Sequence, residues 1–173
     1  MKTTDQMRTS EKNKVLFVCI HNTCRSVMAE AIFNSLAKSW RAESAGVEAV
    51  EALDPVALDV IRSRGYRVEK AKPVNLENVG LGNYGLVVTV CDEASCVNVQ
   101  HPDIERWNVE DPKGKPREVY ERVFDEIETK VKELLKKIRD KDQGKVEVVE
   151  ELLKIKTGGR SENEGTGFKA GQN

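Results

Sequence analysis

The sequence predicts a single α/β domain in which helices cover a parallel β-sheet. Two kinds of segment carry this prediction: continuous apolar runs, as in VLFVCI (15–20) and YGLVVTVC (84–91), and amphipathic segments between and after them. Continuous apolar runs are typical of strands that are buried on both faces. Their alternation with helical patterns favours a parallel sheet with helices on both sides.

The first elements have clear local signals. After the strand at 15–20, the apolar period changes at Ser26, and the following apolar residues share one helical face: Val27, Met28, Ala31, Ile32 and Leu36. The next helix is predicted by its ends. Asp54 is a good N-cap, Pro55 suits the first helical position, and Gly65 suits the C-terminal stop.

The later elements follow the same logic. A second buried strand is expected at 84–91 and a short third one at 104–107. The segment 116–139 predicts a long amphipathic helix, because these residues share one face: Tyr120, Val123, Phe124, Ile127, Val131, Leu134, Leu135 and Ile138. A short additional helix is expected after Gly144.

The 173 residues divide into one domain and two flanking segments. We expect residues 1–13 to form a flexible, polar N-terminus and 14–139 to form the globular domain. The extension 140–173 is expected to be partly disordered, because it ends in the Gly-rich, polar stretch TGGRSENEGTGFKAGQN.

Composition excludes several classes of function. The net charge of -1 implies no strong attraction to nucleic acid or to a membrane surface. No apolar stretch is long enough to cross a membrane, and the N-terminus lacks the apolar core of a signal peptide, so we expect a cytoplasmic protein. In that reducing compartment, the four cysteines are expected to be metal ligands or reactive thiols rather than structural disulfides.

Three chemically capable side chains come at the ends of predicted strands. Cys19 lies near the end of the first strand, Cys91 ends the second, and Asp111 follows the third. In open parallel sheets, ligands bind at the carboxyl ends of the strands, so these side chains are expected at one edge.

Cys19 and Arg25 have the spacing C-x5-R between a buried strand and a helix. Such a loop directs backbone N–H groups at a tetrahedral oxyanion, and the same groups favour a thiolate over a thiol. Arg25 can bind two oxyanion oxygens, Ser26 can donate to the thiolate, and Asn22 tolerates a left-handed backbone. The other interpretation is that Cys19 is a core thiol and Arg25 a surface charge. The predicted oxyanion cradle consists of Ile20, His21, Asn22, Thr23, Cys24, Arg25 and Ser26.

The stretch VLFVCIHNTCRSVMAEAIF (15–33) resembles the signature of the low-molecular-weight protein tyrosine phosphatases and the related thioredoxin-coupled arsenate reductases. The resemblance covers residues 14–139 and includes AESAGVE, LVVTVC and WNVEDPKG. It implies a flavodoxin-like three-layer sandwich with a short, about four-stranded parallel sheet. It also implies that Cys19 is the nucleophile, Arg25 the oxyanion ligand and Asp111 the general acid, although an Asp before Pro112 is also common in simple turns.

The resemblance to the reductases implies a thiol relay. Cys19 binds arsenate, Cys91 attacks Cys19 and releases arsenite, and Cys96 attacks Cys91 to leave a disulfide that thioredoxin reduces. The cysteine pair in CDEASC and the residues Lys113 and Gly114 after Asp-Pro favour a reductase, because the phosphatases usually carry tyrosines there. The alternative is a phosphatase that hydrolyses phosphotyrosine proteins through a Cys19 phosphoenzyme.

The resemblance further suggests a potassium site under the loop, with Asn22, Glu30 and Ser44 as ligands and no clear match for the fourth. No tightly bound cofactor is expected. Two roles stay open: His21 either tunes the loop or only packs, and Cys24 either protects Cys19 as a disulfide or only packs.

Two other classes of protein remain as rivals. Two C-x4-C pairs offer four thiols for a structural zinc site, but such sites usually use C-x2-C. A module that binds anions or senses redox state without turnover would also keep the loop.

Overall fold

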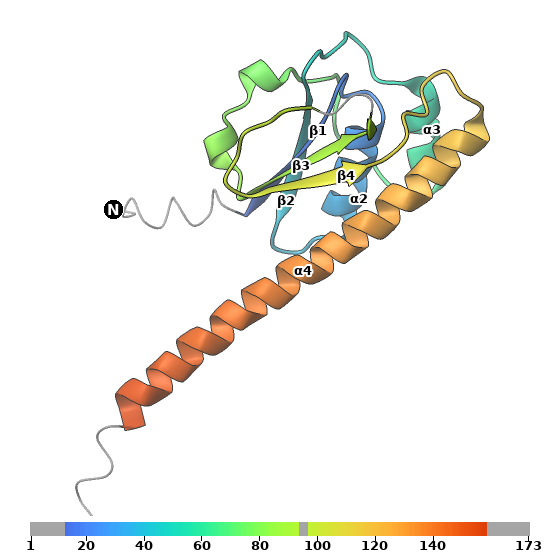
Figure 1. The fold of residues 1–173 in the computed structure, drawn as a ribbon. Coiled ribbons are helices and arrows are strands. Elements are labelled where there is room, and N and C mark those ends of the chain that lie inside the picture. The colour runs from blue at the N-terminus through green and yellow to red at the C-terminus, as the bar shows by residue number, and fades with distance from the viewer. Residues whose placement is uncertain (1–12, 94–96, 159–173) are drawn as a thin grey trace, which may run out of the picture. The chain divides into compact units, whose positions relative to one another are not determined.

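The computed structural model describes residues 13–93 and 97–158, and it contains a four-stranded parallel sheet (Figure 1). The strands lie in the order β2-β1-β3-β4. Their bounds are Lys14–Cys19 for β1, Arg41–Gly46 for β2, Leu86–Cys91 for β3 and Ile104–Asn108 for β4. The predicted α/β fold with a short parallel sheet is confirmed.

Strand β2 has no clear signal in the apolar pattern. It consists entirely of the charged or small residues RAESAG, and its first residue, Arg41, is exposed. It is an edge strand: β1 is its neighbour in the sheet, and on its other side a single bridge joins Gly46 to Asn75, so its solvent-exposed positions can carry charge. The pairing aligns Cys19 with Gly46, while Cys91 on β3 aligns with Asn108 on β4. The chemically capable strand ends therefore share one edge.

The two faces of the sheet are covered differently. The helices are α2 (Arg25–Leu36), α3 (Pro55–Ser63) and α4 (Arg117–Gly158), with 3-10 turns η1 (Leu76–Asn78) and η2 (Leu81–Asn83). On one face, Phe17 packs edge-on against Phe33 of α2. On the other, Leu16 and Val18 form a core cluster with Val97 and Val99, and the residues of the 3-10 turns pack against it. The second covering layer thus consists of short turns rather than long helices.

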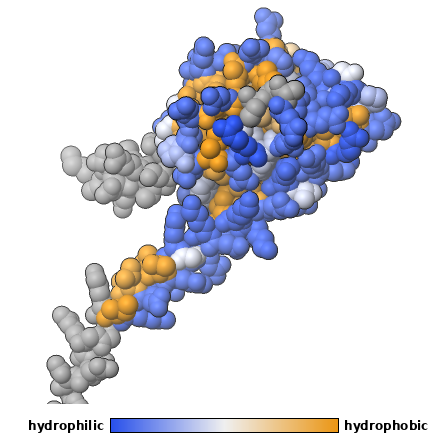
Figure 2. Space-filling view, in the orientation of Figure 1, coloured by the Kyte–Doolittle hydropathy of each residue, from blue (hydrophilic) through white to orange (hydrophobic). Residues whose placement is uncertain are grey.

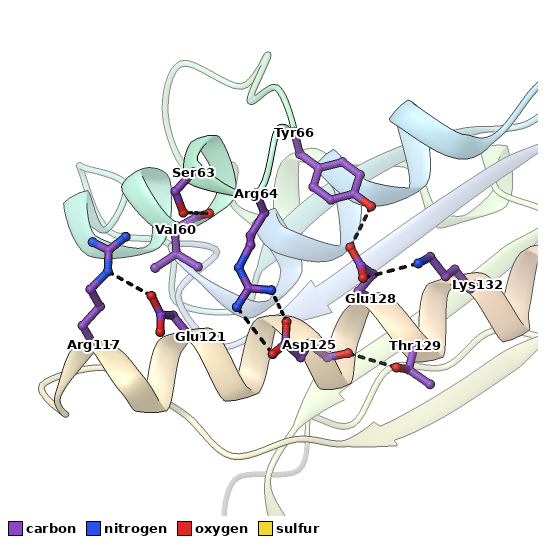
Figure 3. Close-up of polar contacts among 10 residues, drawn as sticks. All are labelled: Val60, Ser63, Arg64, Tyr66, Arg117, Glu121, Asp125, Glu128, Thr129 and Lys132. Atoms are coloured by element: carbon purple, nitrogen blue, oxygen red, sulfur yellow. Dashed lines mark hydrogen bonds and ion pairs between the residues drawn. The ribbon is translucent and has the colours of Figure 1, made fainter.

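Helix α3 begins and ends where its sequence signals indicate. The Asp54 carboxylate accepts hydrogen bonds from the N–H groups of Val56 and Ala57, and Gly65 has a φ of 84° just after the helix. Polar contacts join this region to the first part of α4 (Figure 3). The Tyr66 hydroxyl donates to Glu128 (2.7 Å), and Arg64 pairs with Asp125 while its guanidinium lies over the Phe124 ring.

Helix α4 is longer than the sequence pattern predicts. We expected one helix to 139 and a separate short helix after Gly144, but the structure has one helix over Arg117–Gly158. A single glycine costs only about 1 kcal/mol in a helix interior, which is too little to end this one. Beyond Gly144, the helix carries exposed apolar side chains, which form an apolar patch in Figure 2: Val146, Val148, Val149, Leu152, Leu153 and Ile155.

Within the described ranges 13–93 and 97–158, none of the helices is both long and apolar enough to span a membrane.

Candidate active site

Cys19 ends β1, and its thiol lies within a loop that supplies hydrogen-bond donors. The residue is only 3% exposed. Its Sγ lies 2.8 Å from the Ser26 hydroxyl and 3.2 Å from the backbone N–H of Asn22, which donates to it. The backbone of Asn22 is left-handed (φ 55°), and this turn directs its N–H toward the sulfur. Such donors stabilise a thiolate over a thiol, because they bind the charged form more strongly.

The loop is attached to the chain that follows β2. The N–H groups of Val47 and Glu48 donate to the carbonyls of Cys19 (3.2 Å) and Ile20 (2.8 Å). His21 Nδ1 lies 3.1 Å from the Glu48 carbonyl; a carbonyl can only accept, so Nδ1 is the donor in this contact. His21 thus anchors the loop, and a role in tuning its charge stays a prediction.

Gly46 allows this close approach. A Cβ at Gly46 would lie 2.8 Å from backbone atoms of Ile20, His21 and Asn22. No real Cβ contact is that short, so any larger residue would push the loop away from β2.

Arg25 and Asp111 lie together at the end of β4. The Arg25 side chain is 3% exposed, and its Nη1 donates to the Val109 carbonyl (2.9 Å). Its Nη2 lies 3.6 Å from Asp111 Oδ2. The other carboxylate oxygen of Asp111 accepts from the N–H of Lys113 (3.1 Å), so Asp111 also stabilises the turn at Asp-Pro. Its side chain is 36% exposed, which leaves it accessible to a substrate oxygen.

A chain of hydrogen bonds continues beneath the loop, away from Arg25. The Asn22 amide nitrogen donates to the hydroxyls of Ser26 (2.8 Å) and Ser44 (2.9 Å). The Ser44 hydroxyl in turn donates to the Glu30 carboxylate (2.6 Å). Burial raises the pKa of Glu30, while the Ser44 hydroxyl and the nearby Lys70 ammonium oppose that rise. The three residues predicted as potassium ligands are therefore neighbours.

Their arrangement does not fit a potassium ion, because the ion needs oxygen lone pairs. The Asn22 amide oxygen accepts from the N–H of Val74 (2.9 Å), so the amide presents N–H groups to Ser44. The Lys70 ammonium donates to the Ser44 carbonyl oxygen (2.9 Å). Potassium binding remains a prediction that this geometry does not favour.

The other cysteines have different surroundings. Cys24 is 3% exposed, and burial, followed by the charge of Asp54, raises its pKa well above the usual value. Cys91 is buried at the end of β3, the strand beside β1. Cys96 lies outside the described residues. Over ranges 13–93 and 97–158, no three His, Cys, Asp or Glu side chains gather as a metal centre would require.

Several residues that support the loop of Cys19 and Arg25 were not predicted from the sequence. Gly46, the Val109 carbonyl and Lys70 approach the loop from other elements. Gly46 and Val109 lie in stretches that carry the family resemblance, but no role was predicted for them, and no pattern marks Lys70. Tyr120 is a further case: its hydroxyl donates to Asp54 (2.7 Å), whose N–H donates to the Thr23 carbonyl. Asp54 was predicted only as a helix cap, and the structure shows that it also connects α3 and Tyr120 to the loop.

Comparison with known proteins identifies relatives of two activities. The chain is 34% identical over 123 residues to an arsenate reductase of Staphylococcus aureus strain Newman, covering 67% of this chain and 91% of that protein. A solved arsenate reductase from Archaeoglobus fulgidus is 51% identical (TM-score 0.66) and matches 70% of this chain and 98% of its own. A low molecular weight protein tyrosine phosphatase from T. tengcongensis is 32% identical (TM-score 0.63), with coverage of 72% and 98%.

The family description "Low molecular weight phosphotyrosine protein phosphatase" matches residues 14–144. This range contains the loop of Cys19 and Arg25, the strand end at Cys91 and the turn at Asp111. The chain therefore belongs to the low molecular weight phosphotyrosine protein phosphatase family.

Proposed function

We propose that this protein is an arsenate reductase in which Cys19 is the nucleophile. The observation that carries the proposal is the position of Cys19 Sγ, which lies 2.8 Å from the Ser26 hydroxyl and 3.2 Å from the Asn22 N–H. Cys19 ends β1, and the neighbouring strand β3 ends in Cys91. The arsenate reductases that it resembles support the choice of oxyanion. Thiols of this kind stay reduced in the cytoplasm, where we place the reaction.

The first step forms a bond between sulfur and arsenic. The Cys19 thiolate attacks arsenate, and one arsenate hydroxyl takes a proton from Asp111 and leaves as water. The loop N–H groups and Arg25 hold the remaining oxygens. Arg25 is already fixed by the Val109 carbonyl, so little reorientation is needed when the anion binds.

The next steps transfer two electrons. The Cys91 thiolate attacks Cys19 Sγ, the sulfur–arsenic bond breaks, and its electron pair reduces As(V) to As(III), which leaves as arsenite. Cys96 then attacks Cys91, which frees Cys19 and leaves a Cys91–Cys96 disulfide. A dithiol donor of the thioredoxin class regenerates both thiols. Cys91 is 4% exposed, so its segment must rearrange to reach that donor.

Phosphatase activity is the second candidate. The sulfur, Arg25 and Asp111 are sufficient for hydrolysis of a phosphate ester through a cysteinyl phosphate, without Cys91 or Cys96. Phosphotyrosine proteins are the corresponding substrates. Lys113 and Gly114 follow Asp-Pro, so no tyrosine directly after it frames an aromatic ring.

A paired assay separates the two activities. Arsenate reduction is followed with thioredoxin, thioredoxin reductase and NADPH, and hydrolysis with p-nitrophenyl phosphate on the same preparation. Cys91→Ser should abolish arsenate turnover and leave hydrolysis within about threefold, because it removes only the resolving thiol. Arsenate turnover by Cys91→Ser at the wild-type rate contradicts the relay, and wild-type protein that hydrolyses the ester but does not reduce arsenate favours the phosphatase.

A further inference from the structure

Lys70 lies at the far end of the hydrogen-bond chain that supports Cys19. Its Nζ donates to the Ser44 carbonyl oxygen (2.9 Å), while the hydroxyl of the same serine donates to Glu30 (2.6 Å). Ser44 is 2% exposed. One buried serine thus connects an ammonium group to a carboxylate directly beneath the loop.

The negative charges in this region favour a nearby cation. Glu30 is half-buried, and the Cys19 thiolate of the proposed function adds a second negative charge. A buried negative charge without a compensating partner is costly. Arg25 supplies positive charge on the β4 side, where it contacts the Val109 carbonyl and Asp111. On the opposite side, Lys70 supplies it.

The carboxylates near Lys70 favour its charged form. Burial lowers the pKa of Lys70, and the negative charges of Glu30 and Glu43 oppose that lowering. Glu43 is itself shared with Lys14 (3.5 Å) and with the Tyr84 hydroxyl. The ammonium is therefore held at Ser44, the same serine that contacts the Glu30 carboxylate.

We propose that the Lys70 ammonium is the resident cation beneath the loop and takes the place of a potassium ion. It is a positioning residue: by balancing Glu30, it holds Ser44 and Asn22 so that Asn22 and Ser26 point at Cys19. The inference concerns the loop of the proposed function, but its test uses neither arsenate nor turnover.

The test measures thermal unfolding in KCl, NaCl and choline chloride at equal ionic strength. The wild-type midpoint should be the same in all three salts within about 1 °C, because the site already holds its cation. In Lys70→Met, which keeps a long side chain and removes the charge, the midpoint in choline should fall by about 4 °C. Potassium should restore part of this loss in the variant, because solvent reaches Glu30 through a pocket of about 180 Å3 lined by Glu30, Lys70 and Asn34.

The controls separate charge from packing. Lys72→Met removes an exposed lysine of the same segment and should change neither the midpoint nor its response to salt. Lys70→Arg should behave as wild type. Adding Glu30→Gln to Lys70→Met should recover part of the lost stability, because it removes the unbalanced carboxylate.

Two results overturn the inference. One is a wild-type midpoint that rises with potassium, but not with sodium or choline, because the site would then take the ion itself. The other is a Lys70→Met protein that matches Lys72→Met in every salt. If Lys70→Met fails to fold, the wild-type salt series still decides. Because no substrate is used, a failure here leaves the reductase assignment to the paired assay.

Discussion

Two thiols of the same loop, Cys19 and Cys24, are equally buried but differ in what surrounds them. Both residues are 3% exposed. Cys19 lies against the Ser26 hydroxyl and the Asn22 N–H, whereas none of the described residues hydrogen-bonds to Cys24 Sγ. Burial raises the pKa of Cys24 and favours its neutral thiol. The comparison teaches that equal burial does not give two thiols the same chemistry: burial without donors favours the neutral thiol, whereas directed donors favour the thiolate that the proposed function requires.

The largest expected effect comes from Cys19→Ser. A serine hydroxyl is not ionised near neutral pH, so arsenate reduction and p-nitrophenyl phosphate hydrolysis should both fall at least about a thousandfold. The matched variant is Cys24→Ser, measured in the same assays. Equal losses in the two variants would break the comparison, since they would place Cys24 in the reaction.

Asp111→Asn tests the proposed general acid, which lies beside Arg25. Loss of the proton donor should slow hydrolysis of phenyl phosphate, a poor leaving group, by about 100-fold or more. Hydrolysis of p-nitrophenyl phosphate should slow far less, because its leaving group needs little protonation. Asp103→Asn, at an exposed position before β4, is the control. Equal slowing with both esters would assign Asp111 to the turn with Lys113 only.

Ser26→Ala should leave the Cys19 thiol, like that of Cys24, without a hydrogen bond from the side-chain hydroxyl of any described residue. The change removes the hydroxyl 2.8 Å from the sulfur, and a hydrogen bond to a charged group is worth about 1.5–3 kcal/mol, so the rate should fall about 10- to 100-fold. Ser35→Ala, at an exposed position of the same helix, should leave the rate unchanged. An unchanged rate in Ser26→Ala would show that the backbone N–H groups are sufficient.

The smallest effect on the rate is expected from Cys24→Ala. It removes a buried sulfur that none of the described residues hydrogen-bonds, so kcat should change less than about threefold, while stability falls by about 1 kcal/mol through the small cavity. Urea unfolding and the two assays measure these quantities. A large loss of activity at unchanged stability would contradict an inert Cys24.

Alkylation with iodoacetamide at pH 7.5 compares the reactivity of Cys19 and Cys24 directly. Because its raised pKa keeps Cys24 neutral, Cys24 should resist the reagent in the folded protein and react after unfolding in guanidinium. Cys19 should react in the folded protein, and bound phosphate should slow it. Mass spectrometry of the peptides identifies the modified residue, and faster reaction at Cys24 would reverse the ranking.

Much of the fold around these two thiols can be predicted from the sequence. The strand at 15–20, the helix start after the loop and the Asp54 cap follow from local patterns, because each depends on a few neighbouring residues. Strand β2 is less visible, since an edge strand tolerates charged residues such as Arg41 and Glu43. The break predicted in the C-terminal helix was wrong, because one glycine is too weak a signal to end it.

The sequence by itself determined a strand, a C-x5-R loop and a helix in that order, and therefore a thiol among backbone donors. Only the tertiary structure decided what surrounds that loop: Gly46 behind it, the Val109 carbonyl on Arg25, and Lys70 beneath Ser44. Arg25 and Val109 are 84 positions apart in the chain, and Lys70 and Ser44 are 26 apart. Such contacts depend on the order in which strands pair and on how the connecting segments cross the sheet, which no local pattern encodes.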